Sequence, residues 1–125
     1  MIFDTDVIIW AARGNRRAAW VIDNATDRAM SIVSLMELLQ GAKSKLEARQ
    51  IKDSLRQLQF RILPLSESIG ASAASLIEQY ALANGIQAVD ALIAATALDA
   101  AEPLCTANAN HFRPIRGLDR VAFKP

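Results

Sequence analysis

Hydrophobic residues occur along this chain in short unbroken runs that alternate with longer, periodic stretches. Five short apolar runs predict strands at 1–3, 29–32, 60–63, 104–106 and 121–123. Between them, apolar residues recur three and four positions apart, which predicts helices. The expected helices cover 4–25 with a break at Gly14-Asn15, 34–40, 44–59, 66–84 and 87–101. Short strands that alternate with helices are typical of an α/β fold with a mostly parallel sheet.

The predicted helix boundaries depend on capping and turn residues. Ser34 and Ser66 stand where a side-chain oxygen caps a helix, and Gly41 and Gly85 stand where a helix ends. The last long helix contains AVDALIAATALDAA, and so much alanine implies close packing against a sheet or another helix. Pro103 ends this helix before the strand at 104–106.

Composition favours one globular domain over residues 1–125, with 52% hydrophobic and 22% charged residues. No apolar run approaches the roughly 18 residues of a membrane span, and the acidic start does not resemble a signal peptide. The single cysteine, Cys105, lies in an apolar stretch, which favours a buried thiol. We therefore expect a cytoplasmic protein without a membrane segment.

Four acidic residues interrupt apolar sequence instead of lying among other charges. Asp4 and Asp6 follow the first predicted strand. Glu37 lies in the first turn of the helix after the second strand, and Asp90 lies near the start of the alanine-rich helix. Sites in parallel sheets lie outside the carboxyl ends of the strands, so we expect Asp4, Glu37 and Asp90 to meet there. Two carboxylates about 4 Å apart repel by about 4 kcal/mol at an effective dielectric near 20, which favours a bound cation.

The ligand types favour Mg²⁺ or Mn²⁺, because the chain has one histidine and no cysteine pair for zinc. Each acid also has a structural interpretation. Asp4 or Thr5 is able to cap the following helix, and Ser34-x-x-Glu37 matches a capping box. Asp90 suits the positive end of a helix dipole. Caps alone do not explain why all these acids interrupt apolar segments.

Four segments together resemble the PIN-domain ribonucleases, and specifically the toxins of VapBC-type toxin–antitoxin pairs. They are IFDTDVII, SLMELLQG, AVDALIAATAL and LCTANANHF, and they span almost the whole chain in the order of the family. The resemblance implies a three-layer α/β/α domain around the short parallel sheet.

The resemblance also implies roles for individual residues. The three invariant acids of the family fall on Asp4, Glu37 and Asp90, and Asp6 takes an auxiliary position. The fourth site position is Asn108, where many relatives have aspartate, which leaves the presence of a second metal ion open. Supporting positions fall on Thr5 and Thr106, and the closing pair of the last segment falls on His111-Phe112.

The implied activity is hydrolysis of an RNA phosphodiester, dependent on Mg²⁺ or Mn²⁺, with tRNA or rRNA as substrate. Asp4, Asp90, Glu37, Asp6 and Asn108 would contribute to the metal site, and Glu37 is the candidate to orient or deprotonate the attacking water. The implied partners are a VapB-like antitoxin and a second copy of the chain. The amphipathic helices at 44–59 and 66–84 offer apolar surface for such a homodimer.

Ten of the fourteen basic residues are arginines, and two groups of them follow the site segments. Candidates for RNA binding are Arg13, Arg16, Arg17, Arg113 and Arg116. Arginine suits bidentate contacts to phosphate, although a solvated face or antitoxin binding also accounts for these side chains. His111 is expected to be structural or to contact RNA, not to act as a general base.

Two other functions remain open at this stage. Asp4-Thr5-Asp6 has the spacing of the two aspartates of haloacid-dehalogenase-type phosphatases, but the residues that follow do not match. A non-catalytic interaction protein with the same fold is the second alternative, and the neutral Asn108 is the feature that favours it.

Overall fold

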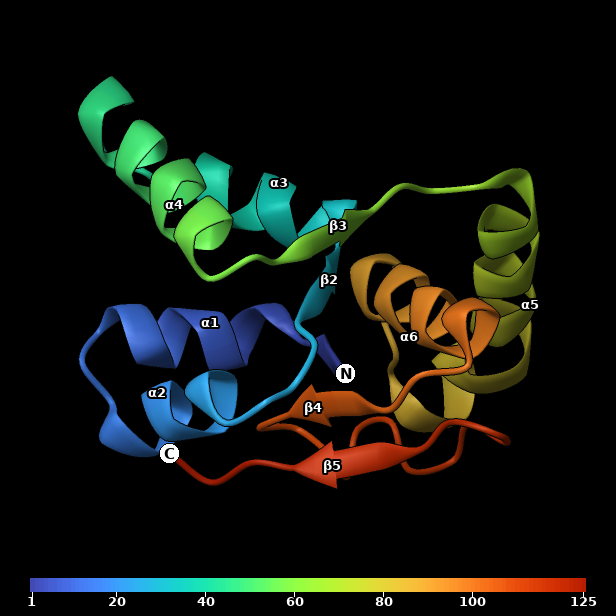
Figure 1. Cartoon of the computed structure of the whole chain (residues 1–125). Helices are drawn as coiled ribbons and strands as arrows, with labels where there is room; N and C mark the ends of the chain where they lie inside the picture. The colour runs from blue at the N-terminus through green and yellow to red at the C-terminus, as the bar shows by residue number, and fades with distance from the viewer.

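The computed structural model describes residues 1–125 and contains five strands and six helices (Figure 1). The strands are β1 (Ile2–Phe3), β2 (Ala29–Ser31), β3 (Arg61–Leu63), β4 (Leu104–Thr106) and β5 (Arg120–Ala122). The helices are α1 (Thr5–Ala12), α2 (Arg16–Asp23), α3 (Ile32–Gln40), α4 (Lys45–Gln57), α5 (Glu67–Asn84) and α6 (Ala88–Ala100). All five predicted strands and the break between the first two helices are confirmed.

The strands form one parallel sheet in the order β3-β2-β1-β4-β5. β1 therefore lies at the centre, although it comes first in the chain, and Ile2 is level with Ala29 on one side and Leu104 on the other. The chain fills the sheet outward from β1 in one direction and then in the other. In open parallel sheets, sites form outside the carboxyl ends of the strands where this direction changes. Here that point lies between β1 and β4.

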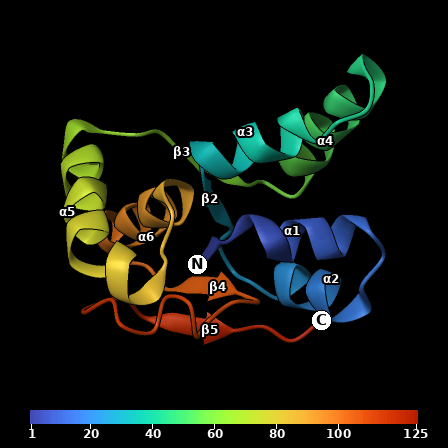
Figure 2. The same cartoon turned by 180° about the vertical axis from the view of Figure 1, so that it is seen from behind.

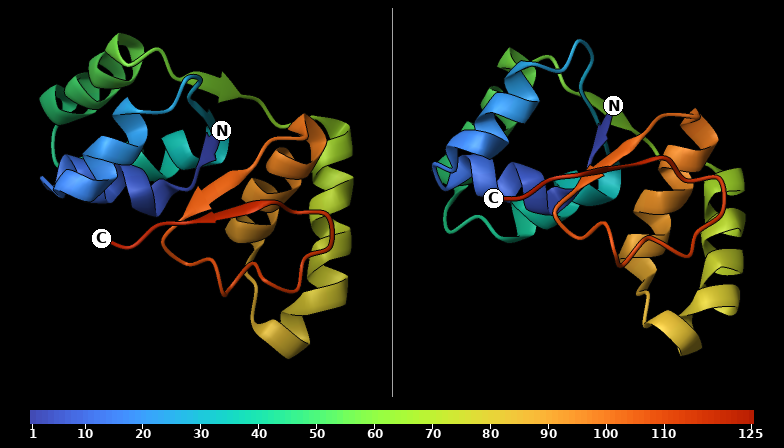
Figure 3. Two further views of the ribbon diagram at one scale, coloured as in Figure 1. Left: turned by 60° about the horizontal axis from the view of Figure 1, so that its bottom comes forward. Right: turned by 90° about the horizontal axis from the view of Figure 1, so that it is seen from below.

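Helices cover both faces of the sheet, which confirms the expected three-layer α/β/α architecture. In Figures 1 and 2, α1–α4 lie together at one side and α5 and α6 at the other. Figure 3 shows β4 and β5 running between the two groups. Successive strand residues point to opposite faces, so Ile2 and Leu104 belong to the core beneath α5 and α6, whereas Phe3 and Cys105 belong to the core beneath α1–α4.

Helix α6 packs closely because its buried positions are small. Ala91, Ala94, Ala95 and Ala97 are all buried in the core shared with α5. Small side chains allow the helix axis to approach its neighbours, which explains the high alanine content of this segment. The helix ends at Ala101, which has a left-handed backbone with φ 53°.

The predicted start of the third helix was wrong. We expected Ser34 to open it, but α3 begins at Ile32, and Ser31 is the cap whose side chain accepts from the Val33 amide. Ser34 lies inside the helix and is fully buried. Glu37 consequently lies in the second turn of α3 and not in the first, so the capping-box interpretation of Ser34 and Glu37 is also wrong.

None of the helices combines the length and the apolarity that a bilayer-spanning segment requires.

Candidate active site

Asp4 lies directly after β1 and caps α1. Its Oδ1 accepts a hydrogen bond from the Thr5 amide at 2.8 Å, and its Oδ2 accepts one from the Thr106 hydroxyl at 2.8 Å. The backbone amide of Asp4 donates to the Cys105 carbonyl at 2.9 Å. These contacts place the carboxylate at the carboxyl ends of β1 and β4, where it is only 7% exposed. The capping and the site interpretations of Asp4 are thus compatible.

Asp6 lies two residues further along the chain, in the first turn of α1, and faces the same edge. Its Oδ2 accepts from the Ala107 amide at 3.2 Å, just after β4. Its Oδ1 is buried and has no hydrogen-bond partner. A buried carboxylate oxygen without a donor is costly, so this atom marks a place where the folded chain leaves charge uncompensated.

The pKa of Asp4 is raised from 3.8 to about 7, mainly by burial and then by the charge of Asp6, with a smaller effect of Asp90 and against the hydrogen bonds from Thr106 and Thr5. Burial is also the main reason why the pKa of Asp6 is raised. Neither carboxylate forms an ion pair with lysine or arginine. Asp4, Asp6 and Asp90 lie near enough for their charges to act on one another, and this group of three aspartates is named here the acidic pocket.

Acidic residues at the opposite end of the sheet, before the strands begin, form ion pairs. There Arg61 bridges Asp27 and Glu102, with a distance of 3.0 Å to Glu102. The hydrogen bond from Arg61 lowers the pKa of Asp27, and bonds from the terminal amine and Arg61 lower that of Glu102. The acids at the amino ends of the strands are thus paired with cations, whereas Asp4 and Asp6 at the carboxyl ends are not.

Glu37 reaches the same edge from α3 through a chain of hydroxyl groups. The Thr5 hydroxyl oxygen lies 2.7 Å from Glu37 Oε1 and 2.8 Å from Ser34 Oγ. A threonine hydroxyl has one hydrogen and a carboxylate only accepts, so Thr5 donates to Glu37 and Ser34 donates to Thr5. This directed chain fixes the carboxylate of Glu37, which is otherwise exposed. The Ser34–Thr5 link was not predicted from the sequence.

Asp90 lies in the first turn of α6 and is held from the loop after β4. Its Oδ2 is 3.1 Å from His111 Nε2, and the His111 ring packs edge-on against Phe112 with centroids 5.7 Å apart. The expected structural interpretation of His111 agrees with this contact. The His111-Phe112 pair at the end of the last motif is the sequence feature that indicates this contact. Phe112 is buried and anchors the loop that carries His111.

Thr106 and Asn108 also lie at this edge, but only the side chain of Thr106 is held by hydrogen bonds. The buried Thr106 hydroxyl donates to Asp4 and accepts from the Asn108 amide at 3.0 Å. Asn108 itself is exposed, and its side chain forms no hydrogen bond. Cys105 beneath it is buried as expected, and burial raises the pKa of its thiol to about 11.

The proposed RNA-binding arginines are all exposed and lie outside this acidic pocket. Arg13 follows α1, Arg16 and Arg17 begin α2, and Arg113 and Arg116 lie in the loop between β4 and β5. None of the five forms a hydrogen bond or an ion pair through its side chain, so all remain available to a ligand.

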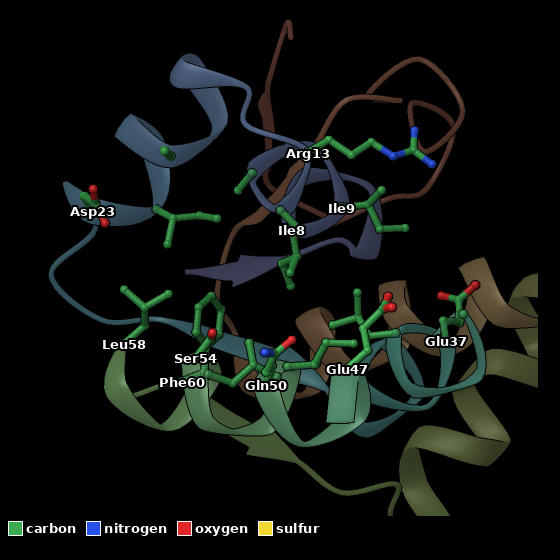
Figure 4. A pocket seen from close by; sticks show the side chains of 18 of the residues that line it. Ile8, Ile9, Arg13, Asp23, Glu37, Glu47, Gln50, Ser54, Leu58 and Phe60 are labelled. Atoms are coloured by element: carbon green, nitrogen blue, oxygen red, sulfur yellow. The ribbon is translucent and has the colours of Figure 1, made fainter. Parts of the chain in front are cut away.

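An elongated groove of about 840 Å³ runs between α1 and α2 on one side and α3 and α4 on the other. Figure 4 shows Arg13 and Glu37 on opposite sides of it, with Ile8 and Ile9 facing Gln50 and Ser54 across the opening. Apolar side chains line much of the groove. Glu37 lines the groove and accepts a hydrogen bond from Thr5, which follows Asp4 in the chain, so this end of the groove lies near the acidic pocket.

The donors at this edge fit a hydrated divalent cation. Carboxylate and amide oxygens are the ligands that Mg²⁺ and Mn²⁺ prefer, and the unpartnered Asp6 Oδ1 lacks a positive neighbour. No three Asp, Glu, His or Cys side chains are arranged so that they could hold a metal ion by themselves. An ion that keeps several water ligands, as Mg²⁺ does, suits such an open arrangement.

Comparisons with known proteins support one family. No curated protein matches the sequence. The fold is similar to a toxin–antitoxin complex from Klebsiella pneumoniae (TM-score 0.82, 28% identity, 97% of this chain and 95% of that one). It is also similar to FitAcB from Neisseria gonorrhoeae, with a TM-score of 0.74 and 28% identity over 95% of this chain and 94% of that one. VapBC2 from Rickettsia felis, bound to a promoter DNA fragment, shares the fold at 23% identity, with a TM-score of 0.78 over 99% of this chain and 100% of that one. The PIN domain model matches residues 1–118, and the chain therefore belongs to the PIN domain family.

Proposed function

We propose that this chain is a metal-dependent endoribonuclease that acts as the toxin of a type II toxin–antitoxin pair, with cytoplasmic tRNA or rRNA as its substrate. The observation that carries this proposal is the acidic pocket, in which the buried Asp4 and the partly buried Asp6 lie near Asp90 without a lysine or arginine partner. The family supports nuclease chemistry, and the similar toxin–antitoxin complexes support the biological role.

The metal site would be formed by Asp4, Asp6 and Asp90, with Glu37 and Asn108 at its rim. When bound, Mg²⁺ or Mn²⁺ supplies an acidified water and a positive charge next to the phosphodiester oxygens. The exposed amide of Asn108 in place of a carboxylate makes one ion the simpler expectation, because it adds no negative charge to the pocket.

The protein side chains orient the reacting groups. Glu37, held by Thr5, is the candidate to accept a proton from the attacking water. Thr106 orients Asp4, and His111 orients Asp90. Outer hydrogen bonds of this kind orient the metal ligands and tune their basicity. The exposed arginines, Arg13, Arg16, Arg17, Arg113 and Arg116, would contact the RNA backbone around the pocket.

The antitoxin would occupy the groove between α1–α2 and α3–α4. The groove is apolar enough to bind a peptide segment and opens toward Glu37 (Figure 4). A basic residue of the antitoxin placed at that end would neutralise the acidic pocket and block RNA from it. A short antitoxin gene next to the gene for this chain would support this assignment.

The first experiment is to incubate the antitoxin-free protein with tRNA and with total RNA, in Mg²⁺, Mn²⁺ or chelator. Asp90→Asn serves as the matched control because it replaces one carboxylate by an amide of the same size. We expect cleavage that requires the metal and is lost in the variant. Cleavage that persists in Asp90→Asn would place the activity elsewhere. A folded protein that binds RNA and cleaves none with either ion would favour the non-catalytic interaction protein, the function that the neutral Asn108 also permits.

A further inference from the structure

Helix α4 presents two faces of different chemistry. One face lines the groove with Glu47, Gln50, Ile51, Ser54 and Leu55. The other surrounds a shallow depression of about 300 Å³ that opens to solvent and touches none of the groove residues. Its cations are Lys45, Arg49, Lys52 and Arg56, named here the outer basic row.

The outer basic row follows from the period of the helix. Its members are spaced by four, three and four residues, so they fall on one side of α4, about one turn apart. From the first to the last they extend over about 16 Å. Figure 1 shows α4 at the margin of the molecule, with α3 between it and the sheet, and all four side chains are exposed.

This arrangement does not help the helix to fold. Like charges three or four residues apart destabilise a helix by about 0.2–0.5 kcal/mol per pair. Lys45 is the first residue of α4, where a cation opposes the helix dipole. Lys45, Arg49 and Lys52 form no hydrogen bond or ion pair, and the single pair, Arg56 with Asp53 at 3.4 Å, is exposed and therefore weak. Local rules broken without compensation often mark a functional surface.

The chemistry of the surface points to a polyanion. A protein partner would require an apolar centre for its interface, and the only apolar residue among these cations is Ala48. Interfaces with nucleic acids are polar and positively charged, and the phosphate contacts in them position the chain without reading its sequence. An extended line of lysine and arginine on one helix face suits such contacts.

We propose that the outer basic row binds the phosphate backbone of the RNA substrate, outside the segment that is cleaved. This inference rests on the proposed ribonuclease function. The row lies on the far side of α4 from the groove, so bound RNA would extend past the rim of the acidic pocket and around α4. The antitoxin in the groove would leave the row free.

The test measures RNA affinity as a function of salt in the Asp90→Asn protein, which cannot cleave the probe. Binding of a labelled single-stranded RNA of about 30 nucleotides is measured by fluorescence anisotropy between roughly 50 and 200 mM KCl. Over this range salt strongly weakens binding that depends on phosphate contacts. The test variant is Arg49→Gln with Lys52→Gln. The matched control is Ala71→Glu with Ala74→Glu on the exposed face of α5, which changes the net charge by the same amount.

Each phosphate contact to a single strand contributes about −0.7 to the slope of log K against log salt. We expect the test variant to reduce the magnitude of the slope by about 1.4 and the control to leave it close to the parent value. Thermal unfolding of the test variant should occur at the parent temperature or slightly above, because a repulsive pair is removed.

An unchanged slope in the test variant, or the same loss in the control, overturns the inference. A loss of affinity for the antitoxin with an unchanged RNA slope also overturns it and assigns the row to a protein partner. The proposed function is judged separately, with Asp90 intact, by metal-dependent cleavage of RNA. Absence of that cleavage contradicts the nuclease but leaves the slope comparison valid.

Discussion

Asp4 caps a helix and at the same time carries a charge that the folded protein does not compensate. Its pKa is 3.8 ordinarily and about 7 in the fold. A raised pKa in an acid means that the folded state binds protons more tightly than the unfolded state does. The resulting stability is complete below pH 3.8 and is lost as the pH rises through 7. The loss for Asp4 amounts to about 4 kcal/mol at alkaline pH, and Asp6 acts in the same direction.

Asp4→Asn should therefore stabilise the metal-free protein at pH 8 while abolishing metal-dependent cleavage. Asparagine keeps an oxygen for the Thr5 amide and removes the charge, so up to about 4 kcal/mol should be recovered. At pH 4 the variant and the parent should unfold alike. Urea unfolding in chelator at both pH values measures this. A variant that is less stable than the parent at pH 8 would mean that the carboxylate matters mainly as a helix cap.

Thr5 is a positioning residue for Glu37, and the two are separated by 32 positions in the chain. Thr5→Val keeps the shape but removes the hydroxyl, so Glu37 loses its hydrogen bond and Ser34 loses its acceptor. We expect Mn²⁺ affinity and cleavage rate to fall about 10- to 100-fold, as is typical when an outer hydrogen bond at a metal site is removed. Thr5→Ser restores the hydroxyl and should restore both. Equal Mn²⁺ affinity in both variants and the parent would show that Glu37 does not need this bond.

At the level of single residues, the sequence identified the acids but not the contacts that orient them. Asp4, Asp6, Glu37 and Asp90 were recognisable because each interrupts apolar sequence. Ser34 gave no such signal, since a buried serine in a helix and a capping serine have the same neighbours in a sequence. Only the packing of α1 against α3 brings its hydroxyl to Thr5.

Among the elements, α3 shows why boundaries are harder to predict than elements. Ser31-Ile32-Val33 contains two β-branched residues directly after β2, and such residues favour strands. The pattern therefore places Ser31 and Ile32 in the strand and predicts that the helix starts at Ser34. In the structure Ser31 caps α3, which moves Glu37 by one turn without removing it from the site.

The sequence predicts a mostly parallel sheet but does not predict the order of its strands. Strands of two or three residues carry too little pattern to select their neighbours, and the pairing of β1 with β4 joins residues about a hundred positions apart. What places β1 at the centre is its burial on both faces, with Ile2 and Phe3 in different cores. That property is visible in the sequence only as a short apolar run.

For the whole molecule, we expect a homodimer at micromolar concentration. The two helices that were expected to offer spare apolar surface each expose a leucine, Leu46 on α4 at 60% and Leu82 on α5 completely. A second copy of the chain that packed against either helix would remove such a side chain from water, which is favourable. Size-exclusion chromatography with light scattering gives the mass directly, and Leu46→Glu and Leu82→Glu identify which helix contributes. A monomer at these concentrations would contradict the prediction.

The central place of β1 determines when, during synthesis of the chain, the acidic site is able to form. Asp4 is synthesised well before its partner Thr106, which lies 102 positions later, and the Ala107 amide that donates to Asp6 lies 101 positions after Asp6. A nascent chain or a truncated fragment that lacks β4 has the acids but no edge to arrange them. Under the proposed function, translation that is interrupted before β4 would release inactive fragments, and nuclease activity would begin only after β4 has been synthesised.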